Sequence, residues 1–150
     1  MSRLDERMEQ ETLEKGISGI LSHFQTLSER LDAMMQPKLA ACSSKEQTIT
    51  IEYPVLEWQL NYRDMMHGGA IVTAFDNTFG ILAHHLNDMH TVVTVSLTVN
   101  YIKPIPKGDS ILVTAKATSL GKKLITVTGE CRLKSSGLLT NTATGIFAIV

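Results

Sequence analysis

The chain has 150 residues, of which 43% are hydrophobic and 19% charged, so it can form one domain with a real core and is too apolar for a disordered chain. The formal net charge of −1 provides no basic excess of the kind that binds nucleic acids or anionic membranes. The sequence predicts neither a membrane span nor a secretory signal, because it has no run of 18 apolar residues and no apolar segment after the mixed-charge N-terminus.

The first 35 residues carry a helical pattern in which apolar residues recur at steps of three and four, and Pro37 ends it. The residues of this stripe are Leu13, Ile17, Ile20, Leu21, Phe24, Leu27, Leu31, Met34 and Met35. We therefore expect an N-terminal helical extension over residues 1–40 of a single domain, 1–150. This extension would pack on the sheet or against another subunit.

A strand is predicted next. Residues 47–53 alternate between polar and apolar side chains, as a half-buried strand does, and Pro54 breaks the alternation. Residues 55–60 are a candidate for a second, shorter strand.

Residues 68–83 form an apolar segment whose single charge is Asp76. A helix that is hydrophobic nearly all round belongs in a core. Its start is predicted at Asp64 or at the turn formed by His67, Gly68 and Gly69. The segment is too short to cross a membrane, so a core helix wrapped by other elements is the better interpretation.

After residue 90 the pattern changes to a period of two. Val93, Val95, Leu97, Val99 and Tyr101 face one way, and Thr94, Ser96, Thr98 and Asn100 face the other. Turn sequences at residues 104–109, 121–122 and 135–137 separate further strand candidates at 111–118, 125–133 and 138–150. The order predicts an α+β fold with an antiparallel sheet curved around one buried helix.

Asp76 is the first candidate for chemistry. An ionised carboxylate is costly to bury without partners, and burial disfavours its charged form, which suits a general base or a nucleophile. The alternative is a carboxylate that pairs inside the fold or reaches solvent at a subunit interface. The helix start offers a complementary group, because its N–H groups are unpaired and favour negative charge, as an oxyanion site requires.

The spacing of polar residues around this helix is specific. Asn61 precedes His67-Gly68-Gly69 by five intervening residues, eight residues separate His67 from Asp76-Asn77, and Thr94 lies in the next strand. From about residue 50 to residue 150, the chain resembles the hotdog-fold acyl-CoA thioesterases. The branch it resembles includes the phenylacetate-pathway thioesterases and the mammalian thioesterase superfamily member 2.

This resemblance implies a hotdog fold and hydrolysis of an acyl or aryl thioester of CoA, with CoA as part of the substrate and no metal or other cofactor. It assigns Asp76 as nucleophile or as base for water, and the Gly68 N–H as the group that polarises the thioester carbonyl. His67 would orient groups around the thioester, and Thr94 would help to position water. The resemblance also implies a homodimer or a homotetramer, in which Asn61 and His67 face Asp76 of another subunit.

Weaker candidates surround these residues. Gly69 and Asn77 flank the principal groups and are assigned to substrate binding. Lys103, Lys122 and Lys123 are candidates for the CoA phosphates, although scattered surface lysines are the alternative. Four further residues have a possible metal-binding spacing, but a solvated helix end is the preferred interpretation of them. They are His84, His85, Asp88 and His90.

Two other functions fit the same fold. One is a binding module that senses acyl-CoA without hydrolysing it, which should lack the helix acid. The other is a hydratase or dehydratase, whose pattern of histidine and acid is not found.

Cys42 and Cys131 lack metal-ligand spacing and are expected to be reduced thiols of a cytoplasmic protein, with a disulfide left open. The acyl group is not predicted.

Overall fold

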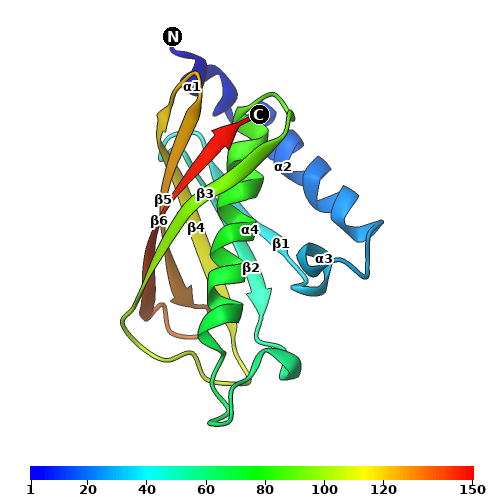
Figure 1. Ribbon diagram of the computed structural model, residues 1–150, viewed down its shortest axis with the longest axis vertical. Coiled ribbons are helices and arrows are strands. Elements are labelled where there is room, and N and C mark those ends of the chain that lie inside the picture. Colours follow the sequence, from blue (N-terminus) through cyan, green and yellow to red (C-terminus); the bar gives the residue numbers. More distant parts are fainter.

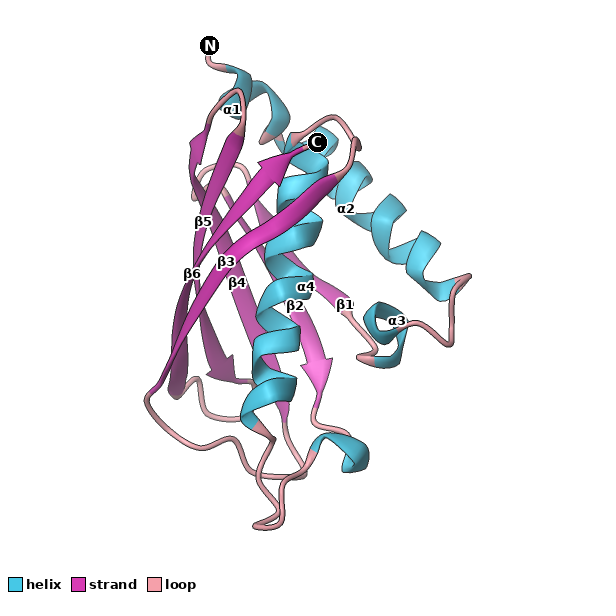
Figure 2. Cartoon of the chain, viewed as in Figure 1, coloured by secondary structure: helices cyan, strands magenta, loops and turns pink.

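One long helix, α4 (Gly68–Leu86), lies along a six-stranded antiparallel sheet in the computed structural model, which describes residues 1–150 (Figure 1). In Figure 2, two of the three N-terminal helices lie on one side of α4, and the first of the three lies at its C-terminal end. These helices are α1 (Arg3–Arg7), α2 (Gln10–Gln25) and α3 (Leu31–Met34), and a short 3-10 helix, η1, spans Glu57–Gln59. None of the helices combines the length and hydropathy needed to cross a lipid bilayer.

The sheet has the strand order β1-β2-β4-β5-β6-β3, and every neighbouring pair is antiparallel. Its strands are β1 (Lys38–Ser43), β2 (Thr48–Pro54), β3 (Val92–Tyr101), β4 (Ser110–Leu120), β5 (Leu124–Leu133) and β6 (Leu139–Ile149). The predicted strands at 47–53, 93–101, 111–118, 125–133 and 138–150 are confirmed, as is a curved antiparallel sheet around a buried helix. Strands β1 and β3 form the two edges of the sheet, and an edge strand has backbone groups available for pairing.

Helix α4 is buried, as its composition predicts. Phe75, Phe79 and Leu82 are fully buried in the core between the helix and the sheet. The helix can approach the sheet closely because Gly129 and Gly145 lie beneath the Phe79 ring, where an added Cβ would come within 2.6 Å and 2.9 Å of ring atoms. This close packing of α4 on the sheet fixes the positions of the polar groups that α4 carries.

Two local elements differ from the prediction. Strand β1 was not predicted, because none of its side chains is buried and they show little alternation. Residues 55–60 contain η1 instead of a strand, since the buried Gln59 side chain accepts a hydrogen bond from the Leu56 N–H at 2.9 Å and closes a turn.

The N-terminal stripe forms three helices instead of one. The Glu9 carboxylate accepts hydrogen bonds from the N–H groups of Glu11 and Thr12 and starts α2, and the chain turns again between α2 and α3. Leu13, Ile17, Ile20, Leu21 and Met35 are buried, whereas Leu27, Leu31 and Met34 are exposed, because the second turn removes them from the core.

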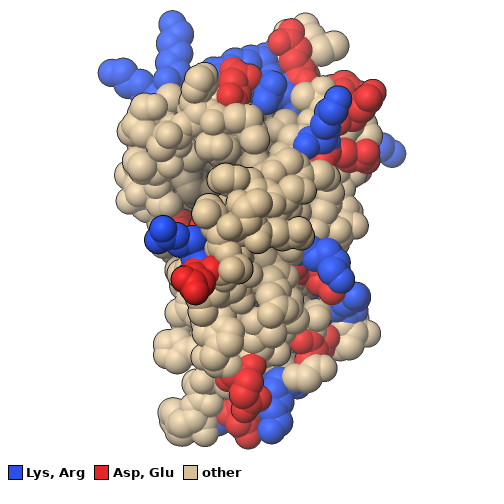
Figure 3. All heavy atoms as spheres, turned by 90° about the vertical axis from the view of Figure 1, so that its right-hand side faces the viewer, with Lys and Arg blue, Asp and Glu red and all other residues tan.

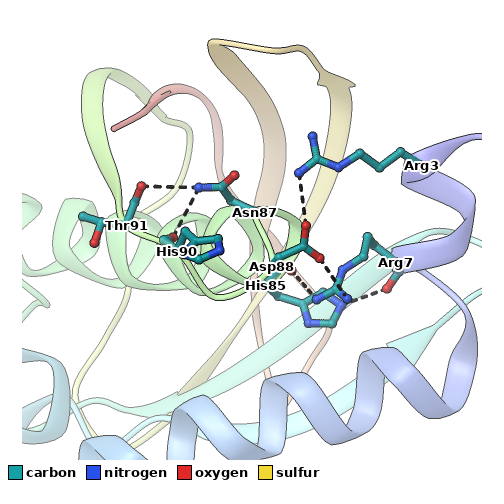
Figure 4. Close-up of polar contacts among 7 residues, drawn as sticks. All are labelled: Arg3, Arg7, His85, Asn87, Asp88, His90 and Thr91. Carbon is teal, nitrogen blue, oxygen red and sulfur yellow. Dashed lines mark hydrogen bonds and ion pairs between the residues drawn. The ribbon is translucent and has the colours of Figure 1, made fainter.

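His85 is buried and does not lie at the solvated helix end that the sequence predicts. The side chain is 1% exposed, because α1 folds over the last turn of α4 (Figure 4). Its Nε2 donates to the Arg7 carbonyl at 2.8 Å, and Arg7 donates back to the His85 carbonyl at 2.8 Å. Arg3 and Arg7 both pair with Asp88, at 3.4 Å and 3.2 Å. Burial lowers the pKa of His85, which favours the neutral ring.

The contact between α2 and this histidine gives a stability prediction. A Cβ at Gly16 would lie 2.2 Å from the His85 Nδ1, whereas a Cβ at Gly19 on the same helix meets nothing within 4 Å. We expect Gly16→Ala to lower the free energy of unfolding by about 2 kcal/mol through overpacking. Gly19→Ala should raise it by up to about 1 kcal/mol through helix propensity. Chemical denaturation checks both, and equal stability of the two variants would contradict the contact.

Candidate active site

Asp76 lies on the third turn of α4 and is half-buried. The Thr94 hydroxyl on β3 donates a hydrogen bond of 2.8 Å to its Oδ1. The carboxylate lines a pocket of about 520 Å³ between α2, α3, α4, β3 and β6, and the apolar part of the wall includes Ile20, Phe24 and Ile81. Asp76 is therefore held by one hydroxyl beside a partly apolar space that a ligand can enter, and we call this the Asp76 pocket.

Thr94 reaches Asp76 because β3 contains a β-bulge. Thr94 pairs with Phe147 and Ser96 pairs with Ile146, so Val95 is an extra residue in the strand. The bulge shifts the alternation, so Thr94 faces α4 on the same side of the sheet as Leu97. The predicted assignment of Thr94 and Leu97 to opposite faces is therefore wrong, and the bulge is the physical reason.

A second carboxylate, Asp32, lines the same pocket from α3. Burial raises the pKa of Asp32, and the charge of Asp76 raises it further. The sequence does not point to this residue, because its approach to Asp76 depends on the turn between α2 and α3, which the helical pattern does not reveal.

The start of α4 forms a separate site. His67 caps the helix, since its Nδ1 accepts a hydrogen bond from the Gly69 N–H at 2.8 Å. The Gly68 N–H makes no hydrogen bond within the chain, while the Gly68 carbonyl accepts one from the Tyr101 hydroxyl at 2.9 Å. An unpaired N–H at the positive end of a helix dipole suits a developing oxyanion.

A pocket of about 390 Å³ adjoins this helix start, and Asn61, Gly68 and Lys103 line it. We call it the Gly68 pocket. The Asn61 side chain accepts hydrogen bonds from the N–H groups of Arg63 and Met65 at 2.9 Å and 3.2 Å, so it holds the loop before α4.

The comparisons with known proteins identify the family. The model of the thioesterase superfamily matches residues 64–140, just over half of the 150 residues. The chain belongs to the thioesterase superfamily. The zebrafish thioesterase superfamily member 2 has a similar structure, with a TM-score of 0.78 at 17% identity, covering 89% of this chain and 98% of that one. The PaaI protein of the phenylacetic acid degradation operon of E. coli has a TM-score of 0.75 at 16% identity, covering 89% of this chain and 94% of that one. These likenesses confirm the hotdog fold.

A hypothetical thioesterase of Streptococcus pneumoniae, solved with coenzyme A, is also similar, with a TM-score of 0.72 at 18% identity over 87% of this chain and 96% of that one. Among curated proteins, an acyl-coenzyme A thioesterase of Xenopus laevis is 36% identical over 84 residues, which is 54% of this chain. The chain spans only 36% to 60% of the length of the curated relatives that it matches.

In this thioesterase-superfamily chain, Asp76 and Gly68 do not meet. They are eight residues apart on one helix, which corresponds to about 12 Å along its axis at about 1.5 Å per residue. Their two pockets share no lining residue. The structure therefore brings together Asp76 and Thr94 at one place, and Asn61, His67 and Gly68 at another.

The other predicted site residues lie at the Asp76 pocket, at the Gly68 pocket, or at neither. Asn77 is buried, lines the Asp76 pocket, and its Nδ2 has no hydrogen-bond partner. Lys103 lines the Gly68 pocket. Lys122 and Lys123 are exposed in the β4–β5 hairpin, which lies at the end of α4 opposite Gly68, and they line neither pocket (Figure 1).

The four residues with metal-ligand spacing, His84, His85, Asp88 and His90, do not come together as a metal site. Asp88 pairs with arginines and His85 bonds to backbone, while His84 lines the Asp76 pocket and His90 is exposed. The structure has no group of three or more His, Cys, Asp or Glu side chains placed to hold a metal ion.

Proposed function

We propose that this chain hydrolyses the thioester bond of an acyl-CoA, with Asp76 as base or nucleophile and the Gly68 N–H as oxyanion donor. The observation that carries the proposal is a carboxylate held by a hydroxyl at a partly apolar pocket, in a superfamily chain that also presents an unpaired N–H at the start of the same helix. The Xenopus relative is named an acyl-coenzyme A thioesterase, and the Streptococcus pneumoniae neighbour was solved with coenzyme A.

The proposed site needs two chains. Strand β3 has one partner in the sheet, β6, and its other edge is free, with Val95 59% and Tyr101 55% exposed. Two copies of β3 can pair antiparallel about a twofold axis. Thr94 contacts Asp76 near one end of β3 and Tyr101 contacts Gly68 at the other. Such pairing therefore places Asp76 beside the partner's Gly68.

The chemistry follows from this arrangement. As a base, Asp76 takes a proton from a water molecule, whose oxygen attacks the thioester carbonyl carbon. The partner's Gly68 N–H donates to the oxyanion that forms. When the oxyanion collapses, the carbon–sulfur bond breaks, and the sulfur of CoA leaves with a proton. As a nucleophile, Asp76 would instead attack the carbon and expel CoA as its thiolate, which forms a mixed anhydride, and water then cleaves this anhydride to the free acid and the Asp76 carboxylate.

The same pairing suggests where CoA lies. Lys103 lines the Gly68 pocket of one chain. The Ile149 N–H bonds to the Lys123 carbonyl, and Ile149 pairs with Val92 at the start of β3, so the β4–β5 hairpin lies near that end of the strand. In the twofold pair, this end approaches the partner's Gly68 pocket. Lys122 and Lys123 are therefore proposed to contact CoA phosphates bound there.

Two substitutions of Thr94 test the role of its hydroxyl group. Thr94→Ala removes the hydroxyl that holds the carboxylate, so we expect kcat to fall by about tenfold, as for the loss of one hydrogen bond of about 1.4 kcal/mol to a charged group. Thr94→Ser keeps the hydroxyl and should retain most of the activity. Release of free thiol from acyl-CoA measures both rates, and equal losses in the two variants would exclude this role for the hydroxyl.

A panel of acyl-CoAs of increasing length, together with aryl-CoAs, tests the proposed activity. Thiol release from at least one of them is expected, with no added metal or redox cofactor. Binding without turnover of any compound would favour the sensor alternative, and addition of water to an enoyl-CoA would favour a hydratase.

Cys42 and Cys131 are free thiols, in keeping with the cytoplasmic location that we propose.

A further inference from the structure

A second and larger cavity lies next to the Asp76 pocket. It measures about 890 Å³ and lies between α2, α3 and strands β1 and β2. Six of its 13 lining residues are hydrophobic, among them Leu21, Met34, Leu39 and Trp58, and the charged residues Lys38 and Glu52 also line it. Helices α2 and α3, which border the cavity, lie on the side of the molecule that faces the viewer in Figure 3, where charged side chains are scattered among uncharged ones. We call it the second cavity.

Phe24 is the one residue that lines both spaces. It is half-buried on α2 and packs against the core. On α3, the neighbours Asp32 and Ala33 line different spaces, Asp32 the Asp76 pocket and Ala33 the second cavity. The boundary between the two spaces is therefore built from the Phe24 ring and one turn of α3, both from the N-terminal helices.

We propose that Phe24 limits the length of the acyl group, by closing the Asp76 pocket against the second cavity. This inference rests on the proposed function. The pocket beyond Asp76 is walled by Ile20, Ile81 and Phe147, which suits an acyl chain, whereas Lys103 at the other pocket suits the phosphates of CoA. An acyl chain that fills about 520 Å³ next meets the Phe24 ring and the Asp32 carboxyl.

Removal of the ring joins the two spaces. In Phe24→Ala, a long acyl chain can continue past Asp32 along the apolar part of the second cavity's lining. Each methylene newly removed from water contributes about 0.8 kcal/mol, which corresponds to roughly a fourfold gain in affinity. The gain should therefore grow with chain length, while acyl groups that fit the closed pocket gain nothing.

The test compares wild type, Phe24→Ala and the matched control Met34→Ala. Met34 lines the second cavity alone and is 42% exposed, so its truncation enlarges that cavity without opening the boundary. For Phe24→Ala, we expect the ratio of kcat/KM for a sixteen-carbon over a four-carbon acyl-CoA to rise at least about tenfold. For Met34→Ala the ratio should stay within about twofold of wild type. An unchanged ratio in folded Phe24→Ala overturns the inference.

A binding measurement separates this inference from the proposed function. The same two acyl-CoAs are titrated calorimetrically into Asp76→Asn and into Asp76→Asn with Phe24→Ala or, if that chain fails to fold, Phe24→Leu. A shift of the Kd ratio toward the long chain supports the role of Phe24, even where the wild-type chain hydrolyses nothing. An equal ratio with and without Phe24 overturns it. Absence of turnover in wild type counts against the proposed function alone.

Discussion

Replacing Asp76 with asparagine is expected to lower thioester hydrolysis by about a thousandfold, within the range typical of a lost general base. The amide cannot take a proton from water or attack the carbonyl. It can still accept the Thr94 hydrogen bond and preserve the shape of the pocket. We therefore expect the variant to fold and to bind acyl-CoA with nearly unchanged affinity, measured by thermal melting and calorimetry beside the thiol-release rate.

Asp32→Asn is the matched control, because it removes the other carboxylate of the same pocket. It should change the rate by no more than a few-fold. Retention of more than a tenth of the activity in Asp76→Asn, or an equally large loss in Asp32→Asn, would remove Asp76 from its assigned role.

Gly68→Pro is expected to lower the rate by about a hundredfold or more, the usual cost of losing one oxyanion donor. Gly68 is the first residue of α4, where proline is well tolerated and the missing N–H costs no helical hydrogen bond. The preceding His67 has a ψ of 139°, which is compatible with a following proline. The substitution thus removes one donor and leaves the helix in place.

Gly68→Ala is the control for steric effects. It keeps the N–H, and its Cβ would lie 3.4 Å from the Tyr101 ring, which is close to ordinary contact. We expect Gly68→Ala to retain most of the activity and Gly68→Pro to lose it, at similar melting temperatures. Equal rates in the two variants would show that the carbonyl oxygen binds elsewhere.

The sequence predicts the parts of this fold whose side chains follow a strict period. Residues 68–83 are apolar nearly all round and form the buried α4, and the strands after residue 90 follow their alternation and their turns. Strand β1 was missed because it is an edge strand in which no side chain is buried. The turn between α2 and α3 was missed because the apolar spacing continues through it.

The candidate site was predictable in its members but not in its arrangement. The motif spacing identified Asp76, Gly68 and Thr94, yet the alternation placed Thr94 on the wrong face, since a one-residue bulge leaves no clear pattern in a single sequence. Asp32 and Phe24 reach the Asp76 pocket only through tertiary packing of the N-terminal helices. The separation of Asp76 from Gly68 was predictable, because both residues lie on the helix predicted over residues 68–83.

Mixed dimers provide the most direct test of a site shared between two chains. Chains carrying Asp76→Asn are coexpressed with chains carrying Gly68→Pro, each with its own affinity tag. Half of randomly formed dimers are mixed, and each mixed dimer would hold one intact site out of two. A shared site therefore predicts recovery of about a quarter of wild-type thiol release, although each variant alone is nearly inactive. Activity in the mixture no higher than that of the separate variants would contradict it.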